Sequence, residues 1–173
     1  MKFLSVLALL ISFAFYSASA QETINWVTFE KAVELQKANP RPYFIYIYVD
    51  GVTWCKEMDA NTFSNPVIAA YLNQNFYAVR LNGEQKEPIT VNGHEFKFFQ
   101  NEQGAWHELA FEFMEGNIKY PTIVCLDKDM GIVQSIPGFQ NPESLEPIIT
   151  YLNLGKYENT PWEDFLATFK SNL

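Results

Sequence analysis

Cysteine is scarce in this chain, which has only Cys55 and Cys125 among its 173 residues. Small secreted domains that are held together by disulfides are dense in cysteine, so this count excludes a disulfide framework and leaves room for one bridge at most. Basic runs are also missing, and the formal net charge is −8. A chain without a basic run argues against nucleic acids and anionic membranes as partners.

Motifs for metal, phosphate and hydrolase chemistry are absent as well. The sequence contains no glycine-rich phosphate loop, no G-x-S-x-G and no H-E-x-x-H. Its two histidines, His94 and His107, do not combine with each other or with Cys55 at a spacing typical of metal ligands, such as C-x2-C or H-x3-H. We therefore expect neither a metal site nor a cofactor.

Residues 1–20, MKFLSVLALLISFAFYSASA, have the features of a secretory signal peptide. Lys2 supplies a positive start, an apolar run covers 3–15, and small residues at 18–20 form an A-x-A cleavage site. A transmembrane anchor is the alternative, but the apolar run is short for a span of ~20 residues. We expect cleavage, which leaves 21–173 as one exported domain with no membrane contact beyond the signal peptide.

The mature part of the chain alternates helical and extended patterns. Residues 43–49, YFIYIYV, are β-branched or aromatic throughout, as in a central strand that is buried on both faces. Asn92-Gly93 is a strong hairpin signal, within an insert over about 83–103. A helix between two strands implies a parallel crossover, so we expect an α/β fold with helices on both faces of a small mixed sheet. The patterns predict helices at 24–40, from about 54, at 64–75, 105–117, 141–155 and 160–170, strands at 43–49, 76–82, 121–127 and 132–138, and a hairpin at 88–99.

Several segments, taken in order, resemble the thioredoxin superfamily. They are the strand at 43–49, then WCK-x-M, then TFSNPVIAAYLNQNFYAVRLN, then YPT at the start of a later strand. More narrowly, the chain is similar to secreted thioredoxin-like proteins whose active-site segment reads C-x-W-C-K-x-M. The resemblance implies a thioredoxin-like three-layer α/β/α fold over 21–173, a history of thiol–disulfide exchange, and export, with the bacterial periplasm as the expected compartment.

The active-site segment admits two alignments to that family. In the first, Trp54-Cys55 opens a W-C-x-x-C motif, Cys55 is the exposed attacking thiol, and Met58 replaces the second cysteine. In the second, WCK ends C-x-W-C-K, so that Cys55 is the inner thiol and Val52 stands at the place of the attacking cysteine. We favour the second alignment because Trp54, Lys56 and Met58 then fall where the narrower family has them.

Either alignment leaves the family reaction incomplete. A thiolate at a helix N-terminus attacks a disulfide, and a second thiol one turn further on resolves the mixed disulfide. With Val52 at the first place, no exposed nucleophile remains.

A bridge between Cys55 and Cys125 is not expected. Pro121 resembles the cis-proline that faces the motif, and Cys125 lies ~13 Å further along the strand, whereas a disulfide needs Cα atoms within ~7 Å. We therefore reject a Cys55–Cys125 bridge, interpret Cys125 as a core residue, and interpret Asp50 as a turn residue.

The resemblance also implies a surface that binds a partner. It consists of the active-site loop, the cis-proline loop and the turn before the following helix, which correspond to Val52, Thr53, Trp54 and Cys55, to Tyr120 and Pro121, and to Gly138 and Phe139. An extended peptide can pair with the backbone beside Tyr120, and aromatic rings at the rim suit partner contact. The alternative is that Trp54 and Phe139 pack onto the body of the domain.

Two functions are compatible with these residues. The first is thiol–disulfide exchange by Cys55 alone, with weak turnover that depends on an external reductant, and it requires an accessible, acidified thiol. The second is a binding module on a thioredoxin scaffold that holds a peptide, or a protein thiol or disulfide, without turnover. It predicts a protected Cys55. The hairpin insert is the feature most typical of a specific partner contact.

Overall fold

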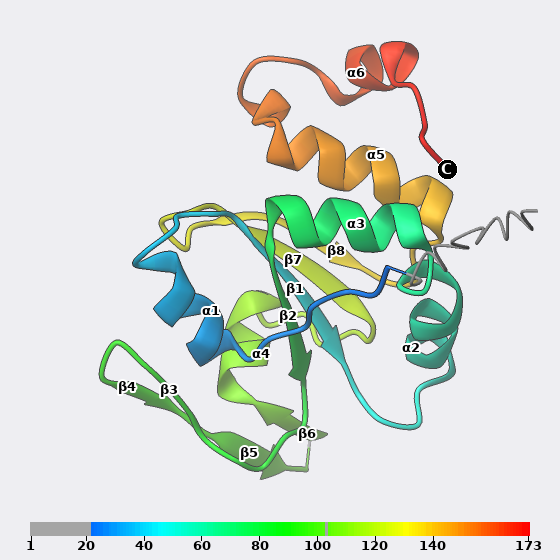
Figure 1. Cartoon of the computed structure of the whole chain (residues 1–173). Coiled ribbons are helices and arrows are strands. Elements are labelled where there is room, and N and C mark those ends of the chain that lie inside the picture. The colour runs from blue at the N-terminus through cyan, green and yellow to red at the C-terminus, as the bar shows by residue number, and fades with distance from the viewer. Residues whose placement is uncertain (1–21, 103) are drawn as a thin grey trace, which may run out of the picture.

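A four-stranded mixed sheet forms the middle layer of the domain (Figure 1). The computed structural model describes residues 22–102 and 104–173, so the predicted signal peptide lies outside the described residues. The strands are β1 (Tyr43–Tyr48), β2 (Tyr77–Asn82), β7 (Thr122–Leu126) and β8 (Ile132–Pro137), in the order β2-β1-β7-β8. β1 and β2 are parallel, whereas β7 is antiparallel to both of its neighbours, β1 and β8.

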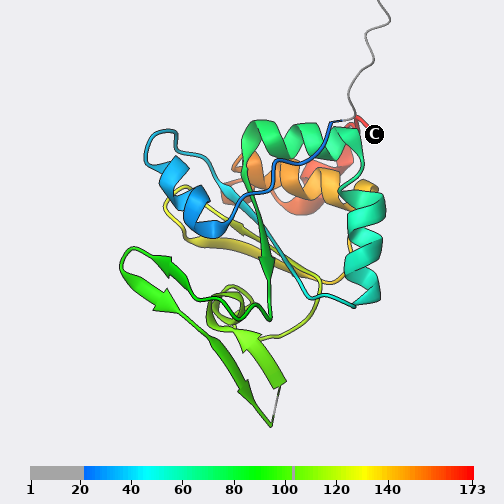
Figure 2. The ribbon, with the colours of Figure 1, turned by 60° about the horizontal axis from the view of Figure 1, so that its bottom comes forward.

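Helices cover both faces of this sheet, as predicted. They are α1 (Phe29–Gln36) and α4 (Glu108–Phe113) on one face, and α3 (Pro66–Asn75) and α5 (Pro142–Asn153) on the other (Figures 1 and 2). Ile45 and Ile47 of β1 enter the core under α1 and α4, while Phe44 and Tyr46 enter the core under α3 and α5. Because successive side chains of a strand point to opposite faces, β1 supplies both cores. The three-layer α/β/α prediction is confirmed.

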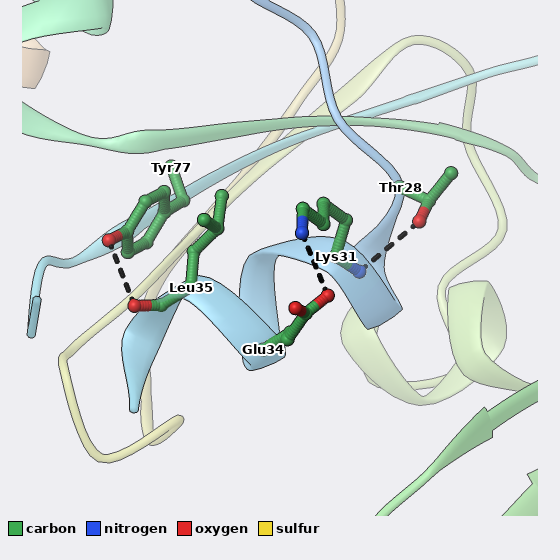
Figure 3. Close-up of polar contacts among 5 residues, drawn as sticks. All are labelled: Thr28, Lys31, Glu34, Leu35 and Tyr77. Atoms are coloured by element: carbon green, nitrogen blue, oxygen red, sulfur yellow. Dashed lines mark hydrogen bonds and ion pairs between the residues drawn. The ribbon is translucent and has the colours of Figure 1, made fainter. Parts of the chain in front are cut away.

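Side-chain hydrogen bonds fix the first helix, as Figure 3 shows. The Thr28 hydroxyl caps α1 by accepting a hydrogen bond from the Lys31 N–H at 3.2 Å. Lys31 also pairs with Glu34 at 2.8 Å on the exposed face of the helix. At the other end, the Tyr77 hydroxyl donates to the Leu35 carbonyl at 3.2 Å. This last bond ties the end of α1 to the start of β2.

The predicted helix at 24–40 is wrong at its start, because 24–28 are not helical. Val27 forms a parallel bridge with Val79. Its N–H donates to the Ala78 carbonyl at 2.9 Å, and its carbonyl accepts from the Arg80 N–H at 3.4 Å. Pairing with β2 outweighs the helical spacing of the apolar residues, and the segment covers the outer edge of β2.

The insert contains two hairpins beside α1 and α4 (Figure 1), and Ile89 and Val91 of the first hairpin belong to the core on that face of the sheet. They pair β3 (Ile89–Val91) with β4 (His94–Phe96), and β5 (Phe98–Asn101) with β6 (Gly104–His107). The turn of the first hairpin is Asn92-Gly93, as predicted, and both residues have positive φ, which asparagine and glycine tolerate. The predicted helix at 105–117 is wrong at its start, because Trp106 and His107 pair with β5 and helix α4 begins only at Glu108.

Short helices complete the structure. They are α2 (Thr53–Glu57), the π-helical turn η1 (Met58–Thr62), the 3-10 turn η2 (Lys156–Glu158) and α6 (Trp162–Thr168). Asn65 caps α3 with its side chain, and Pro66 occupies the first turn. α6 begins at Trp162 with Pro161 as its N-cap residue, whereas the prediction placed this helix at 160–170. Within 22–102 and 104–173, none of the helices has the length and hydropathy that a membrane span requires.

Candidate functional site

The helix that follows β1 separates Val52 from Cys55 by one turn. Val52 is the N-cap residue of α2, and its carbonyl accepts a hydrogen bond from the Cys55 N–H at 3.1 Å. Val52 is half-buried and Trp54 is 58% exposed, whereas Cys55 is only 2% exposed. The aliphatic side chain of Val52 therefore lies at the N-terminus of α2, and the thiol of Cys55 is buried inside the domain.

Cys55 is a free thiol in a protected environment. Burial raises the pKa of this thiol, and the negative charge of Asp59 acts in the same direction. Hydrogen bonds to the Val49 backbone and the Tyr46 side chain, and the positive charge of Arg80, oppose the rise. Since the thiolate is the nucleophilic form, a raised pKa lowers the reactivity of Cys55 at neutral pH.

A buried tyrosine and an ion pair support the helix from below, and the sequence analysis did not identify them. The Tyr46 hydroxyl donates to the Cys55 carbonyl at 3.1 Å. Arg80 of β2 pairs with Asp59 at 2.7 Å, and its guanidinium lies 4.4 Å from the centre of the Tyr48 ring. Burial raises the pKa of Asp59, while the charge of Arg80 and the hydrogen bond to it lower that pKa. Asp59 could have been found by its spacing of four residues from Cys55, which places both on one helical face.

Met58 lies at the place of the second cysteine in the first of the two alignments. Its side chain is fully buried in the core beneath α3 and α5. The carbonyl of Met58 accepts a hydrogen bond from the Phe63 N–H at 3.0 Å, which is the wide spacing of the π-helical turn η1. A thiol at position 58 would thus replace core packing rather than face a partner.

The second side of the site is formed by the ends of β7 and β8. The Tyr120–Pro121 peptide bond is cis, and Pro121 is buried. Gly138, at a φ of 100°, donates its N–H to the Pro121 carbonyl at 2.7 Å. Phe139 comes next, and its ring centre lies 5.4 Å from that of Trp54. Helix α2 and the turn after β8 therefore meet through two aromatic side chains.

Tyr120 connects the site to the start of the insert. Its hydroxyl donates to the Gly83 carbonyl at 3.4 Å, and a Cβ atom at Gly83 would collide with the Tyr120 ring. Burial, followed by the charges of Glu84 and Cys55, raises the pKa of Tyr120 to about 12. Gly83 also donates to the Tyr48 carbonyl at 2.7 Å and accepts from the His107 N–H at 2.6 Å. The root of the insert is thus packed against the residue that precedes the cis-proline.

The other residues that the sequence analysis considered lie apart from Cys55. Cys125 is a free, buried residue of β7, and burial raises its pKa to about 12. Asp50 is exposed and accepts a hydrogen bond from the Asn82 side chain at 3.3 Å. His94 is exposed on β4, whereas His107 is buried on β6. Over the described ranges, no three histidine, cysteine or acidic side chains come together as metal ligands would.

Comparison with known proteins places this arrangement in a family. The family described as "Thioredox_DsbH: Protein of unknown function, DUF255" matches residues 11–123. The chain belongs to this family. The resemblance to the thioredoxin superfamily is thereby confirmed.

One curated relative of this chain is "Uncharacterized protein B0495.5" of Caenorhabditis elegans. It is 26% identical over 93 residues, which are 53% of this chain. The match spans only 13% of the length of that relative, so the nematode protein is far longer than this domain.

Solved structures show the same fold. A DsbH oxidoreductase aligns with a TM-score of 0.52 and 13% identity, over 77% of this chain and 85% of its own. A thioredoxin from Thermus thermophilus aligns with a TM-score of 0.55 and 19% identity, over 75% and 87%. A putative disulphide-isomerase from Bacteroides thetaiotaomicron aligns with a TM-score of 0.53 and 16% identity, over 79% and 97%. The chain thus has a thioredoxin fold, which it shares with these proteins.

Proposed function

We propose that this protein is a partner-binding module of thiol–disulfide exchange ancestry whose own turnover is weak or absent. The observation that carries the proposal is the position of Cys55, which is 2% exposed, beneath the N-cap residue Val52. In this proposal Cys55 is the inner cysteine of a C-x-W-C-K segment, and Val52 replaces the attacking one.

The chemistry of exchange is the reason to expect that turnover is weak or absent. Reduction of a disulfide requires an exposed thiolate that forms a mixed disulfide and expels one partner sulfur, and then a second thiol that displaces the other partner sulfur as the protein's own disulfide forms. Val52 cannot perform the first step. Cys55 could enter a mixed disulfide only after local opening of the helix, and release would then need an external thiol. The raised pKa of Cys55 opposes this monothiol route.

The partner surface comprises Val52, Thr53 and Trp54 with Tyr120, Pro121, Gly138 and Phe139. Trp54 remains 58% exposed although it contacts Phe139, and therefore offers an aromatic face to a partner. The backbone beside Tyr120 offers pairing to an extended peptide. The partners in this proposal are peptides or proteins that carry thiols or disulfides.

Export to the bacterial periplasm is part of the proposal and rests on the sequence of residues 1–20. Expression of the full chain in a bacterium, followed by fractionation and N-terminal sequencing, tests it. A periplasmic protein that begins at Gln21 supports export, and an uncleaved chain in the cytoplasm contradicts it.

The decisive experiment restores the missing thiol. We expect Val52→Cys to acquire reduction of insulin disulfides with dithiothreitol as electron donor, because it places a thiol at the helix tip one turn from Cys55. Met58→Cys is the matched control and is expected to remain inactive, because position 58 lies in the core. Activity in Met58→Cys alone, or in neither variant, would show that Cys55 is not the inner thiol.

Binding is tested separately from turnover. The probe is a short extended peptide with one cysteine, and its affinity is measured by titration calorimetry. We expect Cys55→Ser to leave the affinity unchanged and Trp54→Ala to weaken it about tenfold, which corresponds to about 1.4 kcal/mol. Loss of binding in Cys55→Ser would instead favour covalent exchange by a single thiol.

A further inference from the structure

One edge strand of the central sheet, β2, is covered by another segment, whereas the other edge strand, β8, is open. The outer edge of β2 is covered by the segment at Val27, which exchanges backbone hydrogen bonds with it. Across the described residues, β8 pairs with β7 alone. The β8 sequence IVQSIP carries no charged side chain, although charges are a usual means by which edge strands avoid unwanted pairing.

The backbone of Ser135 is directed away from the sheet. Gly138 donates to the Pro121 carbonyl at 2.7 Å, so these two residues form a hydrogen-bonded antiparallel pair. Hydrogen-bonded pairs alternate along an antiparallel ladder, so Ile136 and Gln134 also face β7, and Ser135, opposite Val124, faces outward.

A groove runs along this open edge. It encloses about 510 Å³ between β8, α5 and the residues after α5, 154–173, here called the C-terminal extension, and it is mainly apolar. The ring of Tyr151 meets that of Trp162 edge-on at 5.1 Å, and its hydroxyl donates to the Thr160 carbonyl at 2.6 Å. These contacts pack the extension against α5. The lining residues are Val133, Gln134, Ser135, Ile136 and Pro137 of β8, Ile148, Tyr151 and Leu152 of α5, and Tyr157 and Trp162 of the extension.

The charges next to the groove are mostly negative. Tyr157 is 40% exposed, and burial together with the carboxylates of Glu158 and Asp127 raises its pKa. Glu163 follows directly after Trp162, and Lys156 is the one basic residue adjacent in sequence to a lining residue. Carboxylates beside exposed aromatic rings favour a cationic side chain over an anionic one.

We propose that this groove binds an extended polypeptide segment with alternating apolar and basic side chains, which adds as a strand to β8. The outward N–H of Ser135 fixes its register, because the Ser135 carbonyl already accepts a hydrogen bond from the Gln134 side chain at 3.0 Å. Its apolar side chains enter the groove, and its basic side chains are attracted by the carboxylates of Glu158 and Asp127, which act on the lining residue Tyr157. β8 leads through Pro137 directly to Gly138 and Phe139, so the groove is continuous with the partner surface proposed above. The site uses no thiol and does not depend on that function.

A synthetic probe tests this directly. A short acetylated peptide of alternating valine and lysine is titrated into the full mature chain, and binding is followed by calorimetry and by amide hydrogen exchange of β8. We expect binding with protection of the Ser135 N–H, and at least about tenfold weaker binding of the valine–glutamate peptide.

Matched variants separate the strand from the side chain. Ser135→Pro removes the outward N–H at an edge position that tolerates proline, and is expected to weaken binding about tenfold. Ser135→Ala keeps the N–H and should bind like the parent. Glu158→Lys changes only the charge of a side chain, so the backbone hydrogen bonds of the domain should remain. It should weaken binding of the valine–lysine peptide severalfold, because a like charge then lies beside the groove. Trp54→Ala should leave it unchanged, which separates this site from the one at Cys55. Equal binding of both peptides, or unchanged affinity in both Ser135→Pro and Glu158→Lys, would overturn the proposal.

Discussion

Burial is the main cause of the raised pKa of the Cys55 thiol, and the negative charge of Asp59 adds to it, so removing that charge should lower the pKa in part. Asp59 lies one turn after Cys55 and raises the thiol pKa, whereas Arg80, which pairs with Asp59 at 2.7 Å, lowers it. In Asp59→Asn the repulsion of the thiolate disappears and the positive charge of Arg80 remains. Both changes stabilise the thiolate, so the pKa of Cys55 should fall.

The magnitude follows from the spacing of the two side chains. Residues four apart on a helix face each other at ~6 Å. Two unit charges at that distance interact by about 0.7 kcal/mol in bulk water and about 2.8 kcal/mol at an effective dielectric constant of about 20. Because the Asp59 side chain is 32% exposed and already paired with a cation, the low part of this range applies. We expect a decrease of about 0.5 to 1 pKa unit.

The assay is the pH dependence of the carbon-13 chemical shift of Cys55 Cβ, which reports the thiol directly and does not depend on reagent access. Glu57→Gln is the matched control, because this exposed carboxylate is bonded to Asn61 and does not influence the Cys55 pKa. Arg80→Gln should shift the pKa upward. An unchanged or higher pKa in Asp59→Asn would refute the reasoning.

Three further predictions concern packing and stability. Burial raises the pKa of Cys125 from 9.0 to about 12, so the unfolded chain releases this proton first and stability falls as pH rises above about 9. Between about pH 8 and about pH 10, Cys125 should lower the free energy of unfolding by about 1.4 kcal/mol, and Cys125→Ala should remove this contribution in urea unfolding. Equal slopes of the unfolding free energy against pH in the parent and the variant would contradict this prediction. The buried Glu146 carboxylate accepts three hydrogen bonds from the C-terminal tail, so Glu146→Ala should cost about 2–3 kcal/mol and expose α6 to proteolysis, whereas the exposed Glu143→Ala should not. Gly83→Ala should cost about 1–3 kcal/mol through its clash with Tyr120, and a double-mutant cycle with Tyr120→Ala should recover part of this loss.

The sequence pattern predicted the structure correctly where the residues that determine it lie within one helix, strand or turn. The unbroken apolar run at 43–49 predicted a strand buried on both faces, and β1 is such a strand. Asn92-Gly93 predicted its hairpin turn because these two residue types tolerate positive φ. The cap of α3 by Asn65 is equally local. These features depend on neighbours in sequence, and hence a single sequence reveals them.

Pattern failed where a distant strand competes with a helix. Residues 24–28 and 105–107 have apolar spacing that suits a helix, yet both are extended, because one bonds to β2 and the other to β5. The energy of such pairing comes from residues far along the chain, so local propensity does not report it.

For the site, the sequence by itself determined the inventory: one cysteine beside Trp54, a valine three residues before it, and a proline that opens β7. Only the tertiary structure decided that Cys55 is buried and that Arg80 of β2 meets Asp59 beneath it. The same holds for the edge of β8, which is left open while that of β2 is covered. Exposure, charge pairing and free strand edges arise when separate elements pack together, and they are properties of the assembled surface rather than of any one segment.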